Sequence, residues 1–174
     1  MPINLHEAFV PPCIQILDSV SGLIDKAEAH CVETGCAPSD LIEARLYADM
    51  QPFSYQVKSC AVHSAGALEG VRKGQFGPDW TELPVDFSGL REKIASARAV
   101  LESATADEME GMIGADMRFV VPDRFEWPFT AEKFLTGFSL PNFYFHATTA
   151  YDILRMKGVK LGKLDYLGAV PANG

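Results

Sequence analysis

The most informative stretch of this sequence is Leu140-Pro-Asn-Phe-Tyr-Phe-His-Ala-Thr-Thr-Ala-Tyr-Asp-Ile-Leu-Arg-Met-Lys-Gly-Val159. It predicts a helix from about Leu140 or Pro141 to Lys157, because proline suits a first helical turn and Gly158 is a typical helix stop. Asn142 precedes His146 by four residues, so an amide and an imidazole lie one turn apart on the same face of this helix.

Three further segments have apolar residues at spacings of three and four, which is the periodicity of amphipathic helices. They run from Cys13 to about Glu33, from about Pro52 to Lys73, and from about Asp86 to Ala104. Pro11 and Pro12 either precede the first of these or kink a helix that begins near Asn4. The pattern predicts an all-α fold, a four-helix bundle with a long connection between helices 3 and 4.

The segments between these helices give weaker signals. We expect a short helix from Ser39 or Asp40 to Leu46, a short strand or extended segment at Met117–Pro122, a loop at Asp123–Phe129, a short helix that begins at Thr130, and an extended tail at Val159–Gly174.

Length and composition limit the classes of function. A chain of 174 residues and 19.0 kDa predicts a single domain over residues 1–174. Hydrophobic residues make up 48%, which is enough for a packed core and excludes intrinsic disorder. The net charge of −8 and the pI near 4.9 argue against binding to nucleic acid or to anionic membrane surfaces. No segment is apolar enough to predict a membrane span.

We expect a cytoplasmic protein with reduced thiols. The first ten residues contain neither a basic region nor an apolar run, so no signal peptide is expected. The cysteines form no CxxC pair and no zinc-knuckle spacing, and we interpret them as reduced core thiols. They are Cys13, Cys31, Cys36 and Cys60, of which Cys31 and Cys36 flank a helix end and could be exposed.

His63 and His146 are the two histidines that lie mid-helix among apolar neighbours. A buried imidazole needs partners for both ring nitrogens, so each is a hydrogen-bonded core residue, an acid or base, or a metal ligand. His63 shares one face with Ser59, Gly66 and Gly70. Such small residues permit either close helix packing or an open pocket beside His63.

The cluster of His63, Asn142 and His146 is the candidate site of the sequence. Two imidazoles and an amide oxygen on facing helices suit a borderline divalent cation such as Zn²⁺ or Ni²⁺. Without a carboxylate or a thiolate, the affinity would be modest. A hydrogen-bonded cluster without a metal is equally consistent with these residue types.

The final helix and the tail after it resemble the DinB/YfiT-like superfamily, and more narrowly an uncharacterised bacterial family within it in which Pro-Asn-Phe-Tyr-Phe-His recurs. The narrow resemblance covers essentially the whole chain, including Leu161-Gly-Lys-Leu-Asp-Tyr-Leu-Gly168. The superfamily resemblance implies a four-helix bundle, often a homodimer, in which three histidines hold a divalent metal. One histidine comes from the second helix, and the other two form His-x-x-x-His on the fourth.

In the superfamily pattern, Leu-Arg and then Gly-Val follow the second histidine, and Leu154-Arg155 and Gly158-Val159 match them here. His146 then matches the second histidine of the pair, Asn142 stands where the first would be, and His63 matches the histidine of the second helix. Because asparagine is the weaker ligand, the resemblance implies that a Zn or Ni ion is bound weakly or not at all.

Two functional hypotheses follow. In the first, the chain is an enzyme of the metal-dependent hydrolase or thiol-transferase type, in which a metal or the His63/His146 pair activates water or a thiol. In the second, it is a non-catalytic binding or stress-related bundle whose His/Asn cluster is a structural or vestigial network. The small-molecule substrate is unknown in both.

Overall fold

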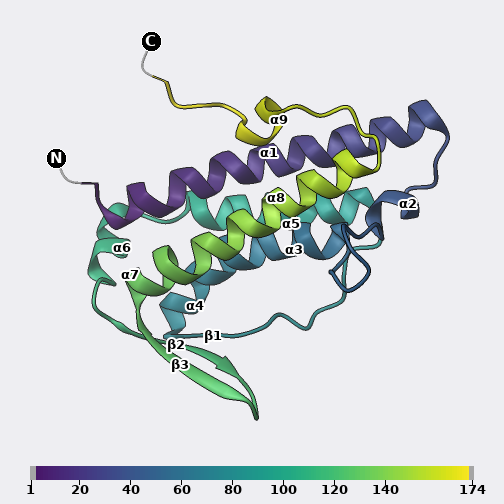
Figure 1. Ribbon diagram of the computed structural model, residues 1–174. Helices are drawn as coiled ribbons and strands as arrows, with labels where there is room; N and C mark the ends of the chain where they lie inside the picture. Colours follow the sequence, from purple (N-terminus) through teal and green to yellow (C-terminus); the bar gives the residue numbers. More distant parts are fainter. Residues whose placement is uncertain (1–2, 173–174) are drawn as a thin grey trace.

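The computed structural model describes residues 3–172 and is rich in helices (Figure 1). The elements, in chain order, are α1 (Leu5–Thr34), α2 (Ser39–Ile42), α3 (Phe53–Ala61), the π-helical turn η1 (Val62–Gly66), α4 (Ala67–Lys73), β1 (Gln75–Phe76), α5 (Phe87–Glu102), α6 (Ala106–Gly111), β2 (Asp116–Val121), β3 (Phe125–Thr130), α7 (Ala131–Lys133), η2 (Phe134–Ser139), also π-helical, α8 (Leu140–Met156) and α9 (Lys163–Leu167).

Helix α1 begins well before the prolines. Asn4 is its N-cap, and the side-chain oxygen of Asn4 accepts a hydrogen bond from the backbone N–H of Glu7 at 2.8 Å. Pro11 and Pro12 lie inside the helix, so the helix start near Asn4 expected in the second alternative is confirmed. Gly35 ends α1 in the left-handed conformation, with a φ of 75°, as its position after the apolar pattern predicts.

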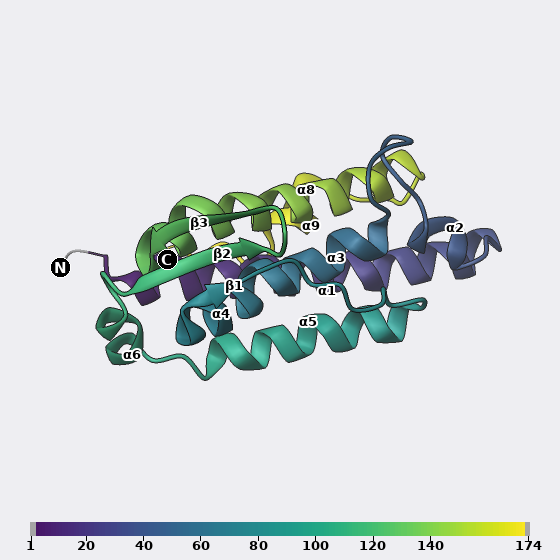
Figure 2. The same cartoon turned by 90° about the horizontal axis from the view of Figure 1, so that it is seen from below.

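The long helices pack side by side. Figures 1 and 2 show α1, α3, α5 and α8 running alongside one another, with α3 against both α8 and α5, and α1 against α5 and α8. Their facing side chains form most of the core, whose largest fully buried members include Phe9, Leu17, Phe53, Leu90 and Phe143. The observed bounds of α5 and α8 and the end of α1 agree with the expected ranges to within a few residues, and the expected helix from about Pro52 to Lys73 corresponds to α3, η1 and α4 together.

The helix-rich character of the predicted fold is confirmed, but the chain is not all-α, because it also forms a small three-stranded sheet in the order β1-β2-β3. β1 pairs with β2 in parallel, and β2 pairs with β3 as a hairpin. The segment expected as a loop is strand β3. Its Pro128 pairs with Arg118 on the edge of the sheet, where proline does not interrupt a further ladder of hydrogen bonds.

Two further expectations need correction. The tail, expected to be extended, contains the short helix α9, which lies against α1. The expected count of four helices is not confirmed, because short helices accompany the long ones and a π-helical turn interrupts the second. No helix within residues 3–172 is long and apolar enough to cross a membrane.

Candidate functional site

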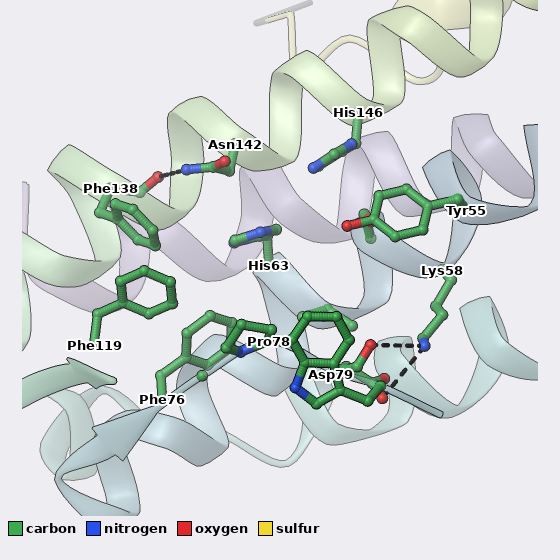
Figure 3. Close-up of a pocket in the computed structure, with 14 residues that line it drawn as sticks. Tyr55, Lys58, His63, Phe76, Pro78, Asp79, Phe119, Phe138, Asn142 and His146 are labelled. Carbon is green, nitrogen blue, oxygen red and sulfur yellow. Dashed lines mark hydrogen bonds and ion pairs between the residues drawn. The ribbon is translucent and has the colours of Figure 1, made fainter. Parts of the chain in front are cut away.

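A cavity of about 340 Å³ opens between α3, η1 and α8 (Figure 3). The loop that follows β1 and side chains from β1, β2 and η2 complete its walls. Its lining includes the whole cluster expected from the sequence, namely His63, Asn142 and His146, so His63 meets residues that lie 79 and 83 positions later in the chain. A volume of this size accommodates a small organic molecule or a hydrated ion.

His63 lies in the π-helical turn η1, where the wider backbone departs from the regular α-helical ladder. Its backbone carbonyl accepts a hydrogen bond from the hydroxyl of Ser139 at 3.0 Å. Because a serine hydroxyl has one proton to donate, Ser139 Oγ must act as the acceptor toward Nδ1 of His63, which lies 3.3 Å away. Nδ1 of His63 therefore carries the proton, and Nε2 keeps its lone pair.

His146 is held in the same tautomer by a different partner. The side-chain N–H of Gln56 donates to the backbone carbonyl of Gln51 at 2.9 Å, which directs Oε1 of Gln56 toward the histidine. Nδ1 of His146 donates to this oxygen at 2.7 Å. In both imidazoles, Nδ1 therefore donates a hydrogen bond to a protein side chain, and Nε2 keeps a lone pair that can accept a hydrogen bond or bind a cation.

The two imidazole rings lie near each other. Their centroids are 5.6 Å apart, and their planes differ by 16°. Burial, together with the nearby His146, lowers the pKa of His63 to about 3, and burial lowers the pKa of His146 to about 4. Both rings are therefore neutral at pH 7.

Asn142 lies on the cavity wall one turn before His146 on α8, on the side toward Phe138 (Figure 3). Its side-chain N–H donates to the backbone carbonyl of Phe138 at 2.7 Å. This hydrogen bond assigns the amide orientation and leaves Oδ1 as the atom that can accept a hydrogen bond or bind a cation.

Lys58 fastens the loop that covers the cavity. Its side chain is buried, and its ammonium group donates to the backbone carbonyls of Asp79 at 3.0 Å and Thr81 at 2.6 Å. The same group lies 3.3 Å from the carboxylate of Asp79. Although burial raises the pKa of Asp79, hydrogen bonds from Thr81 and Lys58 hold that pKa below its usual value. Lys58 has thus used its three protons and acts as a structural residue here.

Aromatic side chains form the remaining walls. Phe76 and Phe138 flank the ring of His63, with centroid distances of 5.5 and 6.0 Å. Tyr55 meets the ring of His146 edge-on at 5.9 Å, and its hydroxyl points into the space beside both histidines (Figure 3). The cavity therefore combines apolar walls, a small number of uncharged polar atoms beside the histidines, and the ion pair of Lys58 with Asp79.

The donor set of this site is neutral. Within residues 3–172, no group of three or more His, Cys, Asp or Glu side chains is placed to hold a metal ion. Any cation in the cavity would rely on the two imidazoles and on the amide oxygen of Asn142. The donor types suit a borderline divalent ion but supply no negative charge.

The sequence reasoning missed four residues of this site, which are Gln56, Lys58, Ser139 and Tyr55. Gln56 lies on the same helical segment as His63 but hydrogen-bonds His146, and Ser139 precedes the helix of His146 but hydrogen-bonds His63. Each orienting residue therefore comes from the segment opposite its histidine, and spacing along one helix does not reveal the pair.

The small residues near His63 have separate roles. Ser59 lines the cavity, whereas Gly70 allows β1 to approach α4. A Cβ atom on Gly70 would lie 2.9 Å from Cβ of Phe76, closer than packing allows. Gly70 therefore permits close packing of β1 on α4, whereas Ser59 faces the open pocket.

Comparisons with known proteins agree with this architecture. A crystal structure of a DinB family member from Shewanella denitrificans superposes with a TM-score of 0.82 and 29% sequence identity, over 98% of this chain and 95% of that one. Comparison with curated proteins gives no match. The narrower resemblance carried by the Pro141–His146 motif stays a prediction. The family model described as a domain of unknown function (DUF1993) matches residues 5–167, and the chain therefore belongs to that family and has a DinB-like fold.

Proposed function

We propose that this protein binds a borderline divalent metal ion, Zn²⁺ or Ni²⁺, through Nε2 of His63 and Nε2 of His146, with Oδ1 of Asn142 as a third donor. The observation that carries the proposal is the matched orientation of the two imidazoles. Ser139 and Gln56 each occupy one Nδ1, so that both remaining nitrogens are unprotonated acceptors at the cavity. Such outer hydrogen bonds are the usual support of metal-binding histidines.

The pKa values favour a ligand role over an acid–base role for the histidines. A general base works best when its pKa lies near the working pH. With a pKa of about 4, His146 would hold a proton in about one molecule in a thousand at pH 7. His63, with a pKa of about 3, is weaker still. A metal ligand, in contrast, must be a neutral imidazole, which is the state that this cavity stabilises.

The affinity that this donor set supports is modest. Two imidazoles provide good nitrogen donors, but an amide oxygen is a poor ligand for Zn²⁺ or Ni²⁺ compared with a third imidazole or a carboxylate. Asn142 is therefore the residue that limits binding.

The proposed activity is of the hydrolase or thiol-transferase type. A bound divalent ion lowers the pKa of a coordinated water or thiol and so supplies a nucleophile at neutral pH. The aromatic walls would contact apolar parts of a substrate, and the hydroxyl of Tyr55 would offer a hydrogen bond to one of its polar groups. Lys58 takes no part in proton transfer, because its protons hold the covering loop.

The apolar walls favour a second candidate function, the binding of a small uncharged molecule without a metal. Phe76, Phe119 and Phe138 offer aromatic faces, and the two free Nε2 atoms accept hydrogen bonds. This non-catalytic alternative predicts that an uncharged aromatic compound with an N–H or O–H group, such as indole, stabilises the protein and that Zn²⁺ does not.

The experiment is a thermal-unfolding series with Zn²⁺ or Ni²⁺ on the untagged protein. We expect a saturable rise in Tm that is lost in His63→Ala and that persists in His30→Ala, a control outside the cavity. Asn142→His restores a third imidazole and should raise the affinity by about tenfold or more. This gain keeps the test decisive if His63→Ala is poorly folded. A wild-type protein and an Asn142→His variant that both ignore the metals would overturn the proposal.

A further inference from the structure

The C-terminal end of α1 carries two cysteines whose sulfur atoms are in contact. The thiol of Cys36 donates a hydrogen bond to Sγ of Cys31, with 2.9 Å between the two sulfurs. Gly35 makes this approach possible, because its left-handed backbone reverses the chain directly after the helix. The N–H of Gly35 donates to the carbonyl of Cys31 at 2.8 Å, which holds residue 36 above the last turn.

The two thiols differ in access to solvent. Cys31 is buried and lies 3.8 Å from the carbonyl of Ala37, whereas Cys36 is half-exposed. Burial, with a smaller contribution from the hydrogen bond of Cys36, raises the pKa of Cys31. Cys36 is therefore the thiol that a reagent from solution meets first.

The other two cysteines provide a comparison within the same chain. Cys13 and Cys60 are both fully buried in the core, and burial raises the pKa of each thiol far above its usual range. Neither has the exposed edge that Cys36 offers. Only the pair at the end of α1, among the described cysteines, combines sulfur contact with access from solution.

We propose that Cys31 and Cys36 form an intrachain disulfide when the protein meets a low-molecular-weight disulfide such as oxidised glutathione. The reaction begins when the thiolate of Cys36 attacks one sulfur of the small disulfide, which releases one small thiol and leaves a mixed disulfide on Cys36. The thiol of Cys31 loses its proton to solvent and attacks Sγ of Cys36, which releases the second small thiol. The protein loses two hydrogen atoms, and the small disulfide is reduced to two thiols.

The disulfide would fix the end of α1 to the segment that leads into α2. That segment continues to Leu41 and Ile42, which are buried in the core. No residue between 31 and 42 lines the cavity described above, so this modification site is separate from the proposed metal site.

Mass spectrometry can test the proposal on the intact chain. After exposure of the native protein to oxidised glutathione and alkylation of the remaining thiols, trypsin cuts after Lys26 and Arg45. The peptide 27–45 then contains both cysteines of the pair and no other. We expect it to be two hydrogen atoms lighter and unalkylated, while the peptides with Cys13 and Cys60 remain reduced. Cleavage after Glu33 should leave two halves joined by the disulfide until a reductant separates them.

Two serine variants separate the steps. Cys31→Ser removes the second step, so the mixed disulfide on Cys36 should accumulate about tenfold above the wild-type level. Cys36→Ser should leave the peptide reduced. A wild-type protein that stays reduced, that accumulates the mixed disulfide to the same extent as Cys31→Ser, or that links two chains through Cys36 would overturn the proposal.

Discussion

Gln56 Oε1 accepts a hydrogen bond from Nδ1 of His146 at 2.7 Å, while the other end of the same amide donates to the carbonyl of Gln51 at 2.9 Å. Gln56 is almost fully buried, so its amide cannot rotate without leaving polar groups unpaired. One side chain therefore fixes both the orientation of the imidazole and the nitrogen that carries its proton.

Replacement of Gln56 by alanine should weaken both stability and metal binding. The change leaves Nδ1 of His146 and the carbonyl of Gln51 without partners, which costs about 1–3 kcal/mol of unfolding free energy. Loss of such an outer contact typically lowers metal affinity about 10–100-fold. Urea unfolding and Zn²⁺ titration measure the two effects. Thr149→Val, which removes a local hydrogen bond on α8 away from the cavity, is the control and should keep the wild-type affinity.

The two histidines should make stability depend on pH in a defined window. Their pKa values, about 3 for His63 and about 4 for His146, lie below the ordinary value of 6.5. As the pH falls below 6.5, the unfolded chain takes up protons that the folded chain refuses, so stability is complete above this pH and is lost below it. The slope approaches about 1.4 kcal/mol per pH unit for each histidine.

Between pH 4.5 and 6.5 this histidine effect is separate from the carboxylates, whose lowered pKa values cost stability only at lower pH. Urea unfolding in the presence of a chelator should show about half the wild-type slope for His146→Gln. His30→Gln should keep the full slope. Equal slopes in His146→Gln and the wild type would show that His146 is not held neutral in the folded protein.

Lys58→Met should loosen the loop that covers the cavity. The variant keeps the length of the side chain but removes the charge that holds two backbone carbonyls and Asp79. We expect a loss of about 2–3 kcal/mol and faster chymotryptic cleavage near Trp80. Lys160→Met is the matched control, since its pair with Glu33 is exposed and contributes about 0–1 kcal/mol. Comparable losses in both variants would argue against this role of Lys58.

Gly70→Ala should displace β1 from α4. The added methyl group would meet Phe76, whose ring packs beside His63, and overpacking of this kind costs about 1–3 kcal/mol. Gly22→Ala is the control on α1, where a Cβ atom meets nothing within 4 Å. Because alanine is the better helix former, the control should gain up to about 1 kcal/mol. Thermal unfolding compares the two, and a neutral Gly70→Ala would contradict the close packing.

The sequence predicts the long helices well because their apolar faces repeat with the period of an α-helix. The same signal cannot reveal η1 or η2, since one wide turn hardly changes that period. Strand β3 was missed because Trp127-Pro128 looks like a loop, whereas an edge strand tolerates proline.

The homodimer and the single domain over residues 1–174 stay predictions.

The candidate site was predictable in its outline. Spacing on one helix pointed to Asn142 and His146, and the structure brings His63 to the same cavity. The residues that orient the imidazoles were not recognised, because a glutamine or serine in a helix looks like a surface residue until its partner is known. The neutral state of the histidines depends on their burial by segments far away in the sequence, such as β1 and η2. The residues next to each histidine in the sequence do not reveal this burial.

The central claim, that Nε2 of His63 and Nε2 of His146 hold a divalent metal, is tested most directly by elemental analysis. The protein would be purified without a chelator or a metal-affinity tag and brought to equilibrium by dialysis against a small excess of Zn²⁺ or Ni²⁺, and the bound metal would be the difference between the protein solution and the dialysate. The account predicts close to one equivalent of metal in the wild type and in Asn142→His, and none above background in His63→Ala. Metal-free wild-type protein, or equal metal in His63→Ala, would contradict it.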